Sequence, residues 1–98
     1  MAYYFMVDTY IDDTMDRKEY DSYIEEVRPI VESYGGEYLV RTENVEHLSD
    51  QRNPQRVILI RFSSKEDLDA CFSSDAYKEI MMKRVNSVDA RAVIVEGL

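Results

Sequence analysis

Four charged or phenolic side chains among apolar strand residues are the candidates for chemistry in this sequence. They are Asp8 and Tyr10 in a first predicted strand, Arg41 in a second and Arg61 in a third. A charge beside apolar neighbours costs desolvation energy unless something compensates it. One interpretation is a set of structural ion pairs. The other is a small pocket in which arginine binds an anionic group while Asp8 or Tyr10 transfers a proton.

The single cysteine and the single histidine offer little further chemistry. Cys71 lies beside Leu68 and Phe72 on a predicted helix face, so we expect a buried structural thiol. A nucleophilic thiol would need a nearby histidine and a partly exposed cleft. His47 lies in a polar stretch and is expected to be solvated, and zinc would need several more nitrogen or sulfur ligands. We therefore expect neither a metal nor a cofactor.

Composition narrows the class of protein and its partners. The chain has 98 residues and a net charge of −8, from 20 acidic and 12 basic residues. That balance repels the phosphates of nucleic acids and anionic lipid surfaces, so neither is an expected partner. The start of the chain lacks the charged and apolar segments of a signal peptide. One cysteine forms no internal disulfide, which is consistent with a cytoplasmic protein.

The elements that must position these residues follow from the spacing of apolar side chains. We expect strands at 3–11, 37–42, 56–62 and 89–96, and helical regions at 16–34 and 65–85, the second broken near residues 73–75. Asp16 and Glu19 resemble a capping box, Gly35 follows the first helix, and Ser64 is placed to cap the second. Tyrosines of the first helix fall on its apolar stripe and are interpreted as packing residues.

This order of elements predicts one domain over residues 1–98, of the α+β class. Strand, helix, strand, strand, helix, strand is the ferredoxin-like βαββαβ unit, a four-stranded antiparallel sheet with helices on one face. The other face would carry Tyr4, Met6, Tyr10, Val57 and Leu59. So large an apolar patch is expected to be covered, and we predict a two-fold homodimer that closes two sheets face to face. The facing of the strand at 37–42 stays open.

Several segments together resemble a known family. They are the stretches 16–23, 34–41 (Tyr-Gly-Gly-Glu-Tyr-Leu-Val-Arg), 56–63, 74–77 and 95–97. The sequence resembles domain-of-unknown-function family thirteen-thirty, within the dimeric α+β barrel superfamily. The resemblance implies this fold and the face-to-face dimer, and it places Arg41 at the strand-two arginine of the family. The sequence departs from the family pattern at Thr42-Glu43, where glycines are common, at Arg61, where an acidic residue is common, and in lacking Trp.

Two functions from different classes follow. The wider superfamily includes cofactor-free monooxygenases, lactone isomerases, haem-handling proteins and ligand binders, and fold alone does not choose among them. The first hypothesis is a cofactor-free small-molecule enzyme, isomerase-like or monooxygenase-like, using Asp8, Tyr10 and Arg41 in a pocket inside the dimeric barrel. The alternative is a non-catalytic dimeric module that binds a small anionic metabolite or a protein partner.

Overall fold

The computed structural model describes all residues, 1–98, and contains four strands and three helices. In chain order these are β1 (Tyr3–Tyr10), α1 (Lys18–Ser33), β2 (Glu37–Thr42), β3 (Arg56–Phe62), α2 (Lys65–Ser73), α3 (Asp75–Val85) and β4 (Asp89–Glu96). The predicted elements are confirmed, including the break of the second helical region into α2 and α3. None of the helices is long and apolar enough to cross a membrane.

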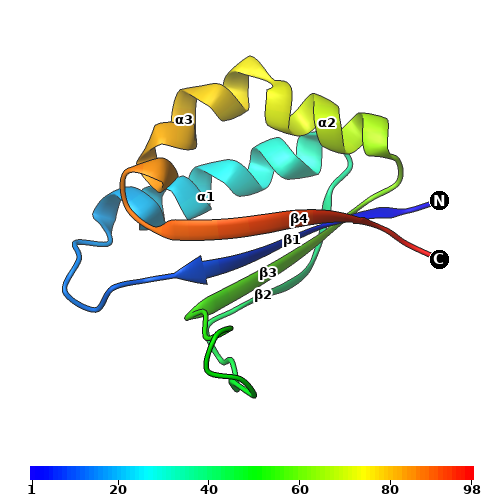
Figure 1. Ribbon diagram of the computed structural model, residues 1–98. Coiled ribbons are helices and arrows are strands. Elements are labelled where there is room, and N and C mark those ends of the chain that lie inside the picture. The colour runs from blue at the N-terminus through cyan, green and yellow to red at the C-terminus, as the bar shows by residue number, and fades with distance from the viewer.

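The four strands form one antiparallel sheet in the order β2-β3-β1-β4, and all three helices lie on one side of it (Figure 1). The helix-covered face of the two central strands carries Phe5, Val7 and Thr9 from β1 opposite Ile60, Ile58 and Arg56 from β3. The ferredoxin-like arrangement predicted from the sequence is therefore confirmed. Core side chains such as Val31, Phe62 and Leu68 are almost completely buried between the sheet and the helices.

Helix α1 begins later than the sequence suggested. The predicted capping box at Asp16 and Glu19 is wrong, because Arg17 is the N-cap residue and makes no side-chain capping bond. Asp16 lies one position too early, and its Oδ1 accepts a hydrogen bond from the backbone N–H of Lys18 at 3.0 Å instead. The end of α1 is as predicted. Gly35 has a φ of +83°, a left-handed conformation that glycine adopts without steric cost.

Two serines define the ends of the shorter helices. Ser64 Oγ accepts from the backbone N–H of Asp67 at 3.2 Å, which confirms the predicted cap of α2. Ser74 ends α2 in an extended conformation, and its Oγ accepts from the N–H of Tyr77 to start α3. This change of direction lets α3 return across the sheet beside α1 (Figure 1).

An irregularity in β2 decides which way its arginine faces. The pairing of β2 with β3 shifts register between Tyr38 and Val40, so Leu39 is the extra residue of a bulge. Beyond the bulge Arg41 lies opposite Ile58, on the helix-covered face, whereas Val40 lies opposite Leu59 on the open face. Simple alternation along the strand would have placed Arg41 and Leu39 on the same face.

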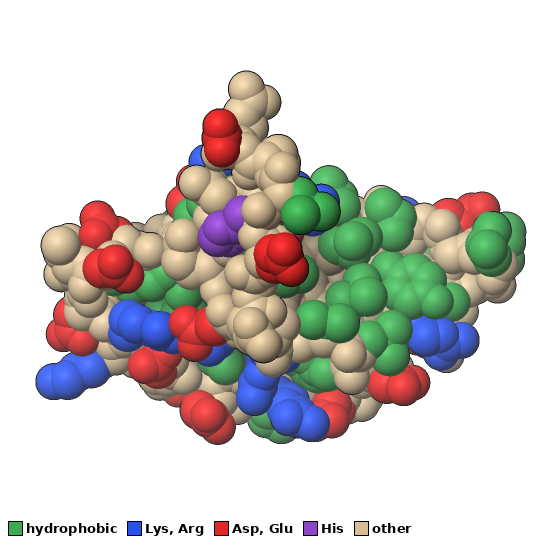
Figure 2. Space-filling view, turned by 90° about the horizontal axis from the view of Figure 1, so that it is seen from below, with side chains coloured by type: hydrophobic (Ala, Val, Ile, Leu, Met, Phe, Trp, Pro, Cys, Tyr) green, Lys and Arg blue, Asp and Glu red, His purple; other side chains and the backbone are tan.

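The open face of the sheet has an apolar half and a polar half. Register places Tyr4, Met6, Leu59, Val93 and Val95 on this face, and Val93 remains 57% exposed. Viewed from this side, the apolar side chains gather over one half of the sheet, and charged groups border the other half (Figure 2). The predicted apolar face is therefore present, and no helix covers it.

Candidate functional site

A cavity lies between the helix layer and the sheet, on the side opposite the open face. Its volume is about 310 Å³. Fourteen of its sixteen lining residues are hydrophobic, a composition typical of small-molecule sites. The lining is Phe5, Val7, Thr9, Tyr20, Tyr23, Ile24, Val27, Val31, Tyr38, Ile58, Ile60, Phe72, Tyr77, Arg84, Ala90 and Ala92.

Aromatic rings from four elements build one end of this cavity. Phe5 of β1 stacks on Phe72 of α2 with ring centres 4.5 Å apart, and Phe72 meets Tyr77 of α3 edge to face at 5.0 Å. Tyr77 in turn meets Tyr23 of α1 edge to face at 6.3 Å. On the floor, small side chains at Ala90 and Ala92 of β4 leave space beside the rings. The rings therefore fix a rigid apolar wall across the gap between helices and sheet.

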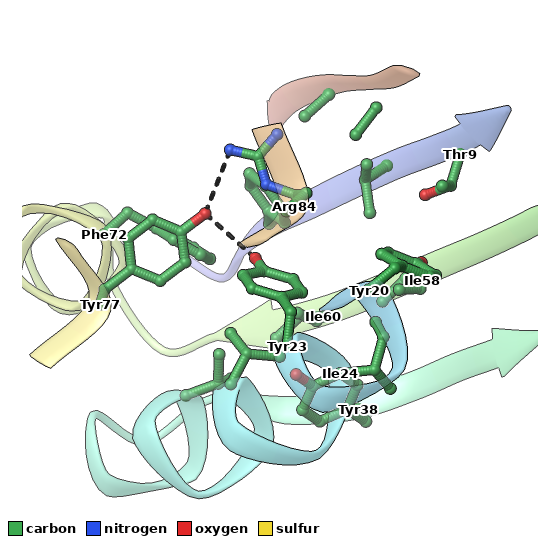
Figure 3. Close-up of a pocket in the computed structure, with 16 residues that line it drawn as sticks. Thr9, Tyr20, Tyr23, Ile24, Tyr38, Ile58, Ile60, Phe72, Tyr77 and Arg84 are labelled. Atoms are coloured by element: carbon green, nitrogen blue, oxygen red, sulfur yellow. Dashed lines mark hydrogen bonds between the residues drawn. The ribbon is translucent and has the colours of Figure 1, made fainter. Parts of the chain in front are cut away.

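The polar groups at this end form a connected network. The hydroxyl groups of Tyr23 and Tyr77 are 3.1 Å apart, and Arg84 Nη2 donates to the Tyr77 hydroxyl at 3.4 Å (Figure 3). The Arg84 guanidinium carbon also lies 5.9 Å from the centre of the Tyr23 ring. No carboxylate is paired with Arg84, whose neighbours here are the Tyr77 hydroxyl and the Tyr23 ring. The network thus presents one uncompensated positive charge and two hydroxyl groups at the wall of an apolar cavity.

Burial raises the pKa of two of the cavity phenols, Tyr23 and Tyr38. Desolvation raises the pKa of Tyr23 far above its ordinary value, and the adjoining Tyr77 hydroxyl adds to the effect. Desolvation likewise raises the pKa of Tyr38 to about 12. At neutral pH these side chains are hydrogen-bonding phenols and not bases, while a guanidinium stays protonated. The arrangement is suited to holding an anionic oxygen.

The residues predicted from the sequence lie outside this cavity and are divided between the two faces. Asp8, Tyr10 and Arg61 are on the open face, and Arg41 is on the helix-covered face, 5.8 Å from the centre of the Tyr38 ring. The structure therefore does not bring Arg41 together with Asp8 and Tyr10.

Two of the three open-face candidates, Asp8 and Tyr10, already have a neighbour. Asp8 accepts two hydrogen bonds from Arg52, from Nε at 2.7 Å and from Nη2 at 3.1 Å. The guanidinium carbon of Arg91 lies 4.4 Å from the centre of the Tyr10 ring. Of the two interpretations left open by the sequence, the ion pair describes Asp8 in this structure.

Cys71 is buried and His47 is exposed, as the sequence predicted. Cys71 is a buried free thiol, and burial raises its pKa to about 11. His47 is exposed, and its Nε2 lies 2.6 Å from the carbonyl oxygen of Pro54. No group of three or more His, Cys, Asp or Glu side chains is placed to hold a metal ion.

Sequence reasoning missed Tyr23, Tyr77 and Arg84. The tyrosines fall on the apolar stripes of their helices, a pattern typical of packing residues. The sequence does not show that a cavity remains between the helices and the sheet beside them. Arg84 lies in the last turn of α3, where a basic side chain is common for electrostatic reasons alone. The usable signal was the number of tyrosines on one helix face, since a buried hydroxyl requires a partner.

Comparisons with known proteins agree with the fold. The sequence matches the family described as Domain of unknown function (DUF1330) over residues 3–98. No protein of curated function matches it. A protein of unknown function from Rhodopseudomonas palustris has a similar structure, with a TM-score of 0.83 and 15% identity, over 99% of this chain and 82% of that one.

Two further solved structures have the same fold at low sequence identity. A dimeric ferredoxin-like protein of unknown function from Jannaschia sp. CCS1 gives a TM-score of 0.66 at 17% identity, over 99% of this chain and 100% of that one. SnoaB, a cofactor-independent oxygenase from Streptomyces nogalater, gives 0.64 at 8% identity, over 99% and 91%.

Proposed function

The chain belongs to the family described as Domain of unknown function (DUF1330), and from that premise we propose that it binds a small, largely apolar organic anion between its helices and its sheet. The observation that carries the proposal is the network of Tyr23, Tyr77 and Arg84 at the wall of the cavity. The apolar lining would hold the hydrocarbon part of the ligand. Arg84 and the phenols would hold its anionic oxygen.

Charge explains why an anion is favoured over a neutral ligand. Arg84 is half-buried and has no carboxylate partner, so a ligand that brings a negative charge supplies what the protein lacks. Hydrogen bonds to a charged group contribute about 1.5–3 kcal/mol each, compared with about 1 kcal/mol for neutral pairs. One of the Tyr23 and Tyr77 hydroxyls donates to the other at 3.1 Å, which leaves one O–H as a further donor at the same point. A carboxylate or an enolate has the matching chemistry.

The test is a fluorescence titration with 2-naphthoate, a flat apolar acid, and with the neutral 2-naphthalenemethanol. We expect the wild-type protein to prefer the acid at pH 7 and the Arg84→Met variant to bind it about 10- to 100-fold more weakly. Lys78→Met removes a positive charge from an exposed position of the same helix and serves as the control. Equal affinity of wild type and Arg84→Met for 2-naphthoate would contradict the proposal. Native mass spectrometry of the purified protein would reveal a carried ligand.

Catalysis without a cofactor is the second candidate function. The observation in its favour is the same network, because a guanidinium and neutral phenols can stabilise an oxyanion that forms during a reaction. SnoaB, which shares the fold, is a cofactor-independent oxygenase. The lining contains no Asp, Glu, His or Lys, so a proton acceptor would have to come from the substrate or from water. Turnover of an enolisable acid that is lost in Arg84→Met would favour catalysis over binding alone.

We also propose that two copies pair through the open face. The apolar half of that face is large, uncovered and centred on β1, and the Jannaschia relative is described as dimeric. In such a dimer the sequence-predicted residues Asp8, Tyr10 and Arg61 would face the space between the sheets, and Arg41 would not. Light scattering at low micromolar concentration should give twice 11.5 kDa, whereas a mass of 11.5 kDa would contradict the pairing.

The free thiol of Cys71 supports a cytoplasmic setting, which we propose as well.

A further inference from the structure

Several buried polar atoms near the end of the cavity away from the aromatic wall have no hydrogen-bond partner. They include the hydroxyl of Tyr20 and two guanidinium nitrogens, Nε and Nη1, of Arg56. Tyr20 is only 1% exposed, so water at the protein surface does not solvate its hydroxyl. Buried polar groups are almost always bonded in native proteins, and an unbonded one calls for an explanation. An acceptor that enters the cavity would provide one.

These atoms gather at the opposite end of the cavity from the aromatic wall. Tyr20 and Thr9 both line the cavity, and Thr9 lies directly opposite Arg56 across β1 and β3. The Arg56 guanidinium carbon is 5.5 Å from the centre of the Tyr20 ring. Thr9 is four residues along β1 from Phe5, a distance of roughly 13 Å at the usual strand rise. In Figure 3, Thr9 and Tyr20 lie on the other side of the cavity from Phe72 and Tyr77.

The charge at this end is already compensated, unlike that of Arg84. Arg56 Nη2 donates to Glu43 at 2.9 Å, and Arg17 Nη1 donates to the same carboxylate at 3.0 Å. Arg17 also contacts Asp21 at 3.4 Å, so two positive and two negative groups balance. What remains unsatisfied is hydrogen-bonding capacity and not charge. A neutral acceptor oxygen fits this end better than a second anionic group.

We propose that Tyr20 forms a second polar subsite, which binds a carbonyl or hydroxyl oxygen on the ligand whose anionic group lies at Arg84. Tyr20 donates its O–H to that oxygen, and Thr9 is another polar residue of the cavity lining. This inference rests on the proposed function and names its ligand class. The ligand is a flat, mainly hydrocarbon acid that carries an oxygen substituent at the end remote from the acid.

Three naphthoates of similar size separate this subsite from the anion site. The probes are 6-hydroxy-2-naphthoate, its methyl counterpart 6-methyl-2-naphthoate, and unsubstituted 2-naphthoate, titrated at pH 7. We expect wild-type protein to bind the hydroxyl compound about five- to tenfold more tightly than the methyl compound. In Tyr20→Phe this preference disappears, while 2-naphthoate binds as before. Tyr34→Phe removes a hydroxyl outside the cavity and should retain the preference.

The outcomes distinguish the two proposals. If 2-naphthoate binds through Arg84 but the hydroxyl group adds nothing, or adds as much in Tyr20→Phe, the subsite is wrong and the proposed function stands. If none of the probes binds the wild-type protein, the proposed function is wrong and the subsite with it.

A second measurement tests Tyr20 without any ligand. If its hydroxyl has no partner in the free protein, its removal should leave the melting temperature unchanged or raise it. A fall of more than about 4 °C in Tyr20→Phe, without a similar fall in Tyr34→Phe, would show that the hydroxyl has a structural partner. That result would overturn the assignment of Tyr20 to a ligand. An unchanged melting temperature together with a lost hydroxyl preference would support it.

Discussion

Polar groups on the two sides of the sheet differ in how fully their hydrogen-bonding capacity is used. On the open face, the carboxylate of Asp8 accepts from Nε and Nη2 of Arg52, and Arg91 is bonded to Asp89. On the helix-covered face, Arg84 has no carboxylate partner and the Tyr20 hydroxyl has no partner at all. Satisfied groups stabilise a surface, whereas unsatisfied ones leave capacity for a ligand. The comparison shows that charge among apolar residues is a weaker sign of a site than unused hydrogen-bonding capacity.

Substitutions at two neighbouring residues of β3 compare the two faces directly. We expect the largest change in the free energy of unfolding from one of them. Ile60 is 3% exposed on the helix-covered face, and Leu59 is the adjacent residue on the open face. Ile60→Ala should lower the free energy of unfolding by about 2–5 kcal/mol at every protein concentration, since it leaves a cavity in the core. Leu59→Ala should lower the free energy of unfolding by less than Ile60→Ala in dilute solution. Urea unfolding at two protein concentrations measures the change in the free energy of unfolding for each variant. Equal changes at high dilution would contradict this difference between the faces.

A charge placed on the apolar half of the open face should separate the proposed dimer. Met6 lies in the middle of β1, opposite Leu59 and Val93 on its two sides. Met6→Asp would bury an unpaired carboxylate between the sheets, and we expect the dimer dissociation constant to rise at least 100-fold. Met82→Asp, at a position 51% exposed on α3, is the matched control and should leave the dimer intact. Sedimentation would contradict the pairing if both variants had the same mass as wild type.

Alkaline pH should lower the stability of the protein through groups on the helix-covered side of the sheet. The folded-state pKa is raised to about 12 for Tyr38 and to about 11 for Cys71, so both stay protonated while the unfolded chain ionises. The unfolded state then binds fewer protons, and stability falls as pH rises from about 9 towards 12. The slope is at most ~1.4 kcal/mol per pH unit for one group, and less where solvent screens it. Urea unfolding between pH 8 and 11 should show a shallower fall in Cys71→Ala. An identical dependence of stability on pH in Cys71→Ala and wild type would contradict the raised pKa of Cys71.

The ion pair between Asp8 and Arg52 should have the smallest effect. Arg52 is 63% exposed, and pairs of this kind contribute little because water and salt screen them. We expect Arg52→Ala to change the melting temperature by no more than about 2–4 °C, and Asp8→Asn to add nothing further in the double variant. A ligand affinity or activity that depends on Asp8 in the proposed dimer would instead support its sequence-predicted role.

Most of the fold was predictable, because local patterns and the global arrangement agree. The unbroken run from Val57 to Ile60, the glycine that follows α1 and the serine that begins α2 each indicated one structure. The start of α1 was not predictable in detail, since Asp16 lies one position before the N-cap residue Arg17 and accepts from the N–H of Lys18, the first residue of the helix. The facing of Arg41 was also not predictable, because a single extra residue at Leu39 reverses every position after it.

The sequence by itself determined the order of elements, the burial of Cys71 and the presence of an apolar, uncovered sheet face. These depend on side-chain period and residue type, which are local properties. Only the tertiary structure decided where a ligand could bind. Tyr20 and Tyr23 come from α1, whereas Tyr77 and Arg84 come from α3. Their hydroxyls and charge acquire meaning only when packing brings some of them together and leaves Tyr20 unpartnered. Hydrogen-bond satisfaction is a property of neighbours in space, and the sequence gives only neighbours along the chain.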